Sequence, residues 1–393
     1  YLSTGMALDI SELIDTYAAE TKELAGDEWL AACEYNGGLY GIPDYKPMAL
    51  TPMIIYREDV AEELGLDMSS VDSIEDLTDI FAQIKAAKPD MTPLSIVETG
   101  NVGVFNLPYG VDYLSDDYNQ PVGVLMGDDM TVQDFYSTDF FKEKATMVRD
   151  WYNNGYLMKD AATTTSTSTE LMASGNYFGW IAAYSYPEED TAASFVAQCS
   201  GYPLAAKTLD KAYLTTGGIN AISWMLAANT EVPEAAMKFL NLTYTDPEIA
   251  NLIIWGIEGR DYVLDENGNA AYPEGQDATT VPYTAQISCG IVGNQFIQYL
   301  PVGSSYDSLE WELEQNKAAD VSPAMGFSFD SSNYTTQYTA VRNVLTQYLP
   351  GIFCGSVDPE TEIPKMVEAL NVAGYQDILN AKQEQLDAWL AQQ

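Results

Sequence analysis

The chain has 393 residues, 58 of them acidic and 17 basic, and its formal net charge is -41. Nucleic-acid binding needs clustered Lys and Arg, and an anionic membrane surface repels a chain of this charge, so both classes of partner are disfavoured. The chain contains no His, and its four cysteines (Cys33, Cys199, Cys289 and Cys354) form no C-x-x-C pair. We therefore expect neither a metal site nor a cofactor. Each cysteine fits a small buried side chain or, in an oxidising compartment, one half of a disulfide.

Helical periodicity alternates with short apolar strands along the whole chain, which is typical of an α/β architecture. Asp139 is expected to cap one helix, and Asp246, with a proline after it, to begin another. An apolar strand is expected at 94–97, and a hairpin around Asn267 and the glycine after it. The periodicity predicts helices over residues 10–20, 77–88, 140–155, 233–244, 247–256, 363–373 and 375–390.

Catalysis has little support in the sequence. A glycoside hydrolase would need two carboxyl groups facing each other across a cleft, and no sequence pattern reports such a pair. The chain contains no G-x-S-x-G, no H-E-x-x-H, no Walker loop and no G-x-G-x-x-G after a strand. We therefore predict no catalytic residues and a protein that is not an enzyme, with a glycoside hydrolase as a less favoured alternative.

Aromatic side chains in polar loops are the stronger signal. The chain has 27 Tyr and 7 Trp. Sugars present apolar C–H faces that stack on flat rings, and a rim of hydroxyls that amides and carboxylates bind. Any single aromatic residue is more often part of a core, but a sugar is the ligand class that this pattern favours. Aromatic residues lie beside amides or charged groups in residues 40–47, 178–190, 253–263 and 292–301.

The order of three segments resembles that of extracellular solute-binding proteins of bacterial ABC transporters, family 1, the maltose-binding type. The segments are YGIPDYKPMALTPMIIYREDVAEELGLD (40–67), ELMASGNYFGWIAAYSYP (170–187) and LTTGGINAISWMLAANTEVPEAAMKFLNLTYTDPEIANLI (214–253). The end of the chain, from AMGFSFD at 324 onward, and WGIEGRDYVLDENG at 255–268 are similar to a subgroup common in gut Firmicutes that carries a C-terminal DUF3502 domain.

The resemblance implies an α/β fold with two lobes and a hinge, the type II periplasmic-binding-protein fold. Residues 1–50 and 225–295 would form the N-terminal lobe. That lobe would be incomplete, because family members carry further strands before the equivalent of residue 1. Residues 51–224 and 296–393 would form the C-terminal lobe, with a DUF3502-like region over about 250–393.

The resemblance also implies a function. The chain would be a monomeric extracellular protein that captures an oligosaccharide between its lobes and delivers it to the permease of an ABC importer. It would be a lipoprotein, held to the outer face of the membrane by an N-terminal lipid that is missing from this sequence. A binding protein for a peptide or polyamine is the alternative within transport, and a structural adhesin is a third class.

The ligand-binding residues expected on these grounds fall into two groups. Aromatic rings would stack on sugar faces, and polar side chains near the segments that cross between lobes would bind hydroxyls. The stacking residues are Trp180 and Trp255, with Tyr109 or Tyr184 as a further platform; the hydroxyl-binding residues are Tyr45, Lys46, Glu258 and Asn294.

Overall fold

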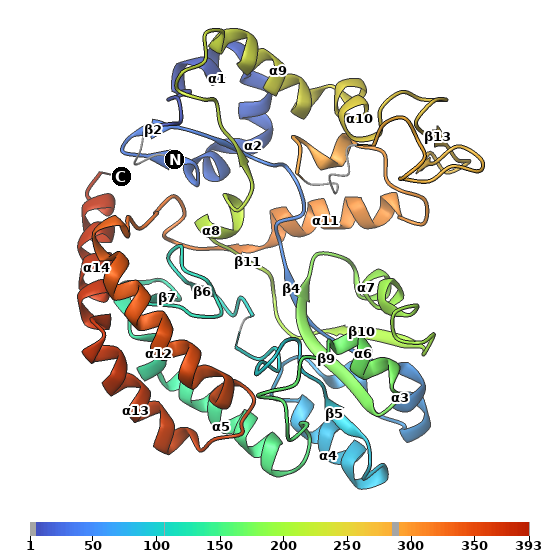
Figure 1. The fold of residues 1–393 in the computed structure, drawn as a ribbon, viewed down its shortest axis with the longest axis vertical. Helices are drawn as coiled ribbons and strands as arrows, with labels where there is room; N and C mark the ends of the chain where they lie inside the picture. The colour runs from blue at the N-terminus through green and yellow to red at the C-terminus, as the bar shows by residue number, and fades with distance from the viewer. Residues whose placement is uncertain (1–4, 106, 285–290, 393) are drawn as a thin grey trace. The chain divides into compact units, whose positions relative to one another are not determined.

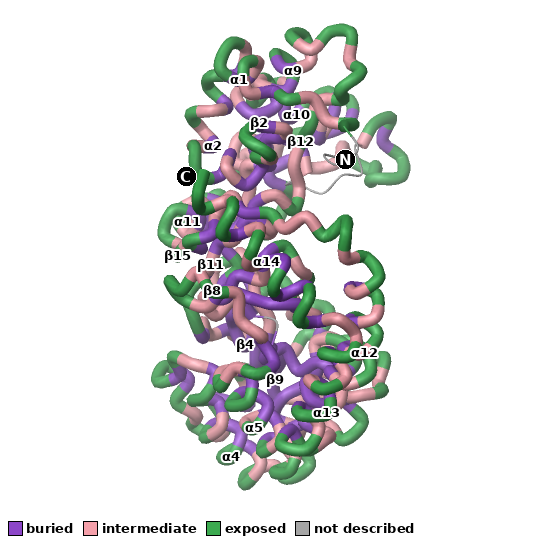
Figure 2. The backbone as a smooth tube through the Cα atoms, turned by 90° about the vertical axis from the view of Figure 1, so that its left-hand side faces the viewer, coloured by how far each residue is buried: buried purple, intermediate pink, exposed green. Residues whose placement is uncertain are grey.

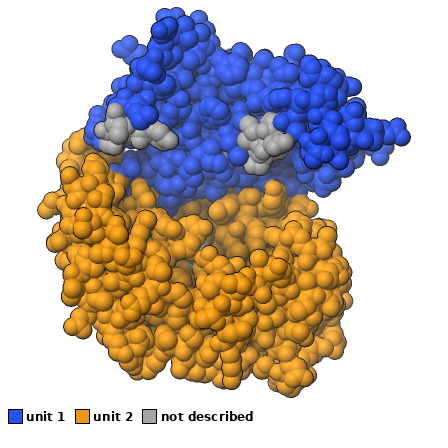
Figure 3. Space-filling model, in the orientation of Figure 1, with its two compact units in different colours: residues 1–48, 214–318, 324–328 blue, residues 49–213, 319–323, 329–393 orange. Residues whose placement is uncertain are grey.

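The computed structural model describes residues 5–105, 107–284 and 291–392. They divide into two units, coloured separately in Figure 3. The chain passes from one unit to the other after residues 48, 213, 318, 323 and 328, so neither unit is one continuous segment. Within the described ranges, no helix is long and apolar enough to span a bilayer. Unit 1 comprises residues 1–48, 214–318 and 324–328, and unit 2 comprises residues 49–213, 319–323 and 329–393.

A four-stranded sheet forms the centre of unit 2 (Figure 1), in the order β10 (Leu204–Thr208), β4 (Thr51–Arg57), β9 (Tyr177–Tyr184), β5 (Thr92–Leu94). Strand β4 runs antiparallel to both its neighbours, whereas β5 runs parallel to β9. All seven residues of β4 are buried (Figure 2). Because alternate side chains of a strand point to opposite faces, Ile54 and Tyr56 join one apolar cluster and Met53 and Ile55 join another.

Helices surround this sheet, and the last three complete its larger core. The rings of Phe105 and Phe353 stack 4.3 Å apart at an angle of 6°, which joins the C-terminal region to the loop after β5. A short meander of β6 (Val111–Asp112), β7 (Val124–Met126) and β8 (Asp129–Gln133) lies beside α14 (Figure 1). The helices are α3 (Glu58–Leu64), α4 (Leu77–Ala87), α5 (Asp139–Asn153), α6 (Ser168–Ala173), α7 (Glu188–Phe195), α12 (Thr335–Phe353), α13 (Pro359–Val372) and α14 (Tyr375–Leu390).

Unit 1 is mainly helical, and its described strands pair only in twos. Its core packs Ile10 and Ile14 against Met237, Leu240 and Tyr244. The helices are α1 (Ser11–Tyr17), α2 (Ala19–Ala31), α8 (Thr216–Ile219), α9 (Pro233–Thr245), α10 (Pro247–Trp255) and α11 (Tyr306–Ala318). The paired strands are β1 (Glu34–Tyr35) with β2 (Gly38–Leu39), β3 (Ile42–Pro43) with β12 (Ser223–Trp224), and β13 (Val263–Leu264) with β14 (Ala270–Ala271). At the crossings between the units, β11 (Tyr213–Leu214) pairs with β15 (Asp320–Val321).

Two local expectations differ from the structure. Thr138, not Asp139, caps α5, because its hydroxyl accepts the Phe141 N–H and its backbone is extended, while Asp139 is already helical. The strand expected at 94–97 lies instead at Thr92–Leu94, because Leu94 is the last residue to pair with β9.

The division of the chain also differs from the lobes expected from the sequence. The structure places 214–224 and 296–318 in unit 1. Two buried side-chain amides hold residues 296–318 in unit 1. Asn251 of α10 bonds to Ile297 O and Tyr299 N, and Asn316 of α11 bonds to Met48 N and Lys46 O.

The N-cap of α10 gives a direct stability test. The Asp246 carboxylate accepts hydrogen bonds from Glu248 N and Ile249 N, at 2.9 and 3.3 Å. Asp246→Ala should lower the free energy of unfolding by about 1 kcal/mol, because two N–H groups lose their acceptor and the helix dipole loses a negative charge. Urea denaturation measures this, with the exposed Glu231→Ala as the matched control. Equal midpoints for the two variants would contradict the capping account.

Candidate functional site

Three segments lie side by side in unit 1 where the chain first leaves for unit 2. Strand β3 pairs antiparallel with β12, placing Pro43 opposite Ser223 and Ile42 opposite Trp224. Beyond β3, Tyr45 forms a parallel bridge with Asn294, and its N–H donates to Gly293 O at 2.8 Å. Segments separated by up to 250 positions in sequence are thereby fixed against one another.

Asp44 lies at the centre of this arrangement and is fully buried. Among the described residues, neither oxygen of its carboxyl group accepts a hydrogen bond of ordinary geometry. Burial raises the pKa of Asp44 to about 7, although the Gly293 backbone, Lys46 and Trp224 lie close enough to oppose part of the shift. A buried carboxylate that its neighbours compensate only in part destabilises the fold, and groups with strongly raised pKa values cluster at functional sites.

Trp224 provides an exposed aromatic surface beside that carboxyl group. The residue is 41% exposed, and its indole N–H donates to Ile291 O at 2.9 Å, which fixes the ring. Met225, which follows it, is 39% exposed. An immobilised indole next to a carboxylate is the combination that binds a sugar ring, with stacking on the C–H face and hydrogen bonds to adjacent hydroxyls.

Of the residues expected from the sequence, Tyr45, Lys46 and Asn294 lie in or next to this group. The ring of Tyr45 lies 5.2 Å from that of Trp29 and 5.4 Å from that of Phe296, so much of it is covered. Asn294 is 4% exposed and its amide is used internally, accepting from Phe296 N and donating to Tyr244 O. Its ligand contact stays a prediction, as does that of the half-buried Lys46.

Trp255 and Glu258 also lie in unit 1, at and after the end of α10. Trp255 is half-buried, and its indole N–H donates to Tyr299 O at 2.9 Å. The ring of Tyr262 lies 6.3 Å from it, so Trp255 belongs to a small aromatic group. Glu258 is exposed on the following turn. The structure gives no contact between either residue and Asp44 or Trp224, and their ligand roles stay predictions.

The remaining expected residues lie in unit 2. Trp180 is 1% exposed; its N–H donates to the Tyr184 hydroxyl at 2.8 Å and its ring packs edge-on against Phe195. Tyr109 is half-buried and donates to Val104 O at 2.9 Å. The stacking roles of Trp180, Tyr184 and Tyr109 stay predictions, and Trp180 would need Phe195 to move before a sugar could reach its face.

Asp44 and Trp224, which the structure singles out, were not among the residues expected from the sequence. Asp44 lies in the 40–47 segment and Trp224 follows the β12 serine, so both were within motifs already noted. Only contacts with 291–294 reveal that the Asp44 carboxyl is buried without a hydrogen bond of ordinary geometry and that Trp224 is held rigid and exposed. Such long-range contacts leave no local pattern in the sequence.

The pH dependence of stability tests the condition of Asp44. Its folded pKa is raised to about 7 from 3.8, so the folded state binds the proton more tightly and stability falls as pH rises between these values. Asp44→Asn removes the charge, and we expect it to raise the free energy of unfolding by about 2 kcal/mol at pH 8. This rise is smaller than the free energy that corresponds to the whole pKa shift, because the buried amide of Asn also lacks hydrogen-bond partners. At pH 4 the gain should vanish. Denaturation at both pH values measures this, and an equal effect at the two would contradict a raised pKa.

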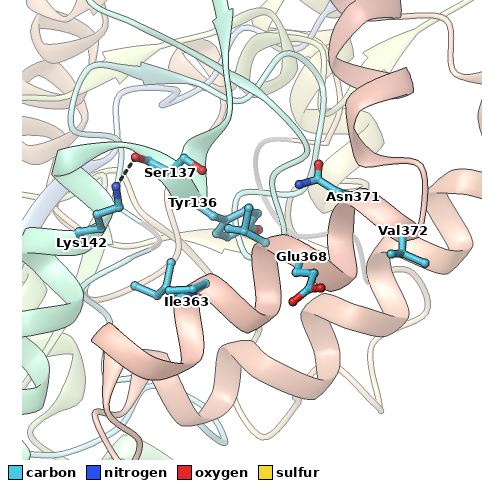
Figure 4. Close-up of a pocket in the computed structure, with 9 residues that line it drawn as sticks. Tyr136, Ser137, Lys142, Ile363, Glu368, Asn371 and Val372 are labelled. Carbon is cyan, nitrogen blue, oxygen red and sulfur yellow. Dashed lines mark hydrogen bonds between the residues drawn. The ribbon is translucent and has the colours of Figure 1, made fainter.

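Two surface pockets formed by described residues of unit 2 differ in character from this group. The larger, about 680 Å³, lies between α13, α5 and the turn before α5 (Figure 4). Lys142 points toward its rim and donates to Ser137 O at 2.7 Å. No residue expected to bind ligand lines either pocket. The larger is lined by Tyr136, Ser137, Lys142, Ile363, Pro364, Val367, Glu368, Asn371 and Val372. The smaller is lined by Thr78, Lys142, Glu143, Thr146, Met147, Asp150 and Trp151.

Metal and thiol chemistry have no evident site in the part of the chain that the structure describes. There, no group of three or more Cys, Asp or Glu side chains is arranged to hold a metal ion. Cys33, Cys199 and Cys354 are free and buried, while Cys289 lies outside the described residues. Burial raises the pKa of Cys33 to about 11, so this thiol is not activated.

Comparisons with known proteins bear on the family and the fold. A domain of unknown function, DUF3502, matches residues 323–391, a shorter region than the sequence analysis expected. A carbohydrate ABC transporter substrate-binding protein of Streptococcus pneumoniae serotype 4 (strain ATCC BAA-334 / TIGR4) is 26% identical over 98% of this chain and 76% of its own length.

Solved structures give the same result for the fold. The N-glycan transport solute-binding protein NgtS from Streptococcus pneumoniae superposes with a TM-score of 0.78 at 24% identity, covering 99% of this chain and 84% of NgtS. NgtS in complex with Man5GlcNAc gives 0.68 at 25% identity, covering 100% of this chain and 84% of that one. The alginate-binding protein AlgQ2 gives 0.61 at 16% identity, covering 98% and 82%. The chain is therefore a relative of the substrate-binding proteins of carbohydrate ABC transporters, with their two-lobed α/β fold and a DUF3502 region at its C-terminal end.

Proposed function

We propose that the chain binds an oligosaccharide outside the cell and delivers it to the permease of an ABC importer. The observation that carries the proposal is the rigid, exposed ring of Trp224 in unit 1 beside the buried Asp44 carboxyl, whose oxygens accept no hydrogen bond of ordinary geometry among the described residues. Sugar hydroxyls come in adjacent pairs and would supply donors to that carboxylate once a side-chain movement exposes its oxygens.

The comparisons support the ligand class. NgtS has been crystallised with Man1GlcNAc and with Man5GlcNAc, and another solute-binding protein that shares the fold, FusA of Streptococcus pneumoniae, with kestose. The sequence relative is named as a carbohydrate ABC transporter substrate-binding protein. We accordingly propose capture without catalysis. A ligand that binds one conformation better than another shifts the population toward it, and a permease can recognise that conformation. The lipid tether implied by the family resemblance stays a prediction.

A thermal-shift screen tests the proposal. Man1GlcNAc, Man5GlcNAc, kestose and fructo-nystose form the sugar arm, and spermidine and a mixed peptide pool form the other arm. Ligand at 100 times its Kd adds about 2.7 kcal/mol to stability, which raises the melting temperature by several degrees. A shift with one glycan family supports the proposal. A shift with spermidine or the peptides alone replaces the sugar by that solute, and released monosaccharide would identify a hydrolase.

A further inference from the structure

The segment Tyr109–Ser115 of unit 2 holds an unusual backbone. Tyr109, Leu114 and Ser115 all have positive φ, at 35°, 50° and 70°. Non-glycine residues avoid this region, and a strained conformation persists only where surrounding contacts impose it. Residues 113–122, here called the anchored loop, continue from this strained segment up to the meander strand β7.

A buried ion pair holds the base of the anchored loop. Lys382 of α14 is fully buried, and its ammonium donates to the Asp116 carboxylate at 2.7 Å. The same carboxylate accepts the Tyr338 hydroxyl of α12 at 3.1 Å and Val122 N at 2.7 Å. The carboxylate is thus fully used, and every side chain that it contacts belongs to the DUF3502 region.

Three further contacts join this region to the loop and to the meander after it. Gln120 donates to the Thr346 hydroxyl of α12 at 3.1 Å. Gln383 of α14 accepts Val132 N at 2.7 Å and donates to Met130 O at 3.1 Å, so its amide pairs with β8 as a neighbouring strand would. A Cβ on Gly123 would lie 2.5 Å from Leu379, which shows how closely α14 approaches.

The anchored loop presents an aromatic ring among polar groups. Tyr118 is 51% exposed; partial burial raises its pKa, and the nearby carboxylates of Asp117 and Glu98 add to that rise. The side-chain oxygen of Asn119 is buried and has no hydrogen-bond partner among the described residues. An exposed tyrosine on an anchored loop, beside carboxylates and an amide side chain, has the chemistry of a sugar contact.

We propose that the DUF3502 helices position the anchored loop, and that Tyr118 is a further sugar-contacting residue, contributed by unit 2. The inference rests on the proposed function and extends it by giving the domain of unknown function a task. Lys382 and Asp116 are then positioning residues, because they act through the loop, whereas Tyr118 touches the ligand.

Isothermal titration calorimetry of the full chain tests the inference. The ligand is whichever of Man1GlcNAc, Man5GlcNAc, kestose and fructo-nystose the wild type binds most tightly. Tyr118→Ala should weaken binding about tenfold, whereas Tyr118→Phe, which keeps the stacking face, should stay close to wild type. Both should melt as the wild type does. Lys382→Met combined with Asp116→Asn removes both buried charges together. This double variant should still fold, bind the glycan about tenfold more weakly and become sensitive to chymotrypsin within 113–122, where Tyr113, Leu114 and Tyr118 are cleavage sites.

The outcomes separate the two proposals. A wild type that binds none of the four glycans contradicts the proposed function, and this inference with it. If the wild type binds a glycan and Tyr118→Ala binds it with unchanged affinity, the proposed function stands, but Tyr118 does not contact the sugar. Unchanged affinity and protease resistance in a folded double variant overturn the positioning role.

Discussion

Replacing Lys382 with Met lowers the free energy of unfolding by about 3–5 kcal/mol, the largest effect that we expect from one substitution in this chain. Lys382 and Asp116 are both buried, and the ion pair between them is the contact that compensates their desolvation. Burial lowers the pKa of Lys382, opposed by the charge of Asp116, so the ammonium depends on that carboxylate. Removing the lysine leaves a buried carboxylate with only neutral donors.

Guanidinium denaturation monitored by circular dichroism measures this loss. The matched control is Lys365→Met, because Lys365 forms an ion pair with Glu362 on the same group of helices but is 54% exposed. Exposed pairs contribute about 0–1 kcal/mol, so the control should unfold nearly as the wild type does. A Lys382 variant that matches this control would show that the buried pair adds no stability.

Replacing Trp224 with Ala weakens glycan binding by about 30- to 100-fold, a loss of about 2–3 kcal/mol. The ring is 41% exposed and is held by its bond to Ile291 O, so its surface is available without rearrangement. A rigid ring stacks on a sugar at little cost in conformational entropy. The fold should be retained, because Ala removes an exposed side chain and not a core one.

Phe239→Ala is the control for this substitution. Phe239 is 55% exposed on α9 of the same unit, while the buried residues of that helix are Met237, Leu240, Thr243 and Tyr244. Titration calorimetry of both variants, with melting curves alongside, separates contact from stability. Equal affinities for the two variants would remove Trp224 from the site.

Local signals predicted much of the fold. Pro233 and Pro247 occupy the first turns of α9 and α10, and Gly256 ends α10, as their intrinsic preferences predict. The hairpin around Asn267 is also confirmed. The sequence analysis did not predict the 19-residue helix α12, whose last turn contains Pro350. Packing of Leu345, Leu349 and Phe353 into the core of unit 2 stabilises that helix, and this packing depends on distant residues.

The site was less accessible to prediction. Trp180 was expected to stack on a sugar, yet its ring is buried on the face of the inner strand β9, where Phe195 packs against it and its N–H bonds to Tyr184. Asp44 appeared to be one acidic residue among 58. Its burial depends on the segment near Gly293, and the rigidity of Trp224 depends on Ile291. Composition indicated the ligand class, while the identity of the contact residues required the tertiary structure.

Equilibrium titration of the wild type tests the central claim most directly. The titrants are Man5GlcNAc, kestose and fructo-nystose, and mass spectrometry analyses the sugar recovered afterwards. Our account predicts saturable binding of one glycan family at one site, and recovery of that glycan unchanged. It also predicts tighter binding at pH 8 than at pH 5, because Asp44, with a pKa raised to about 7, must be ionised to accept two hydroxyls. Absence of binding at both pH values, or recovery of shortened glycan, would contradict it.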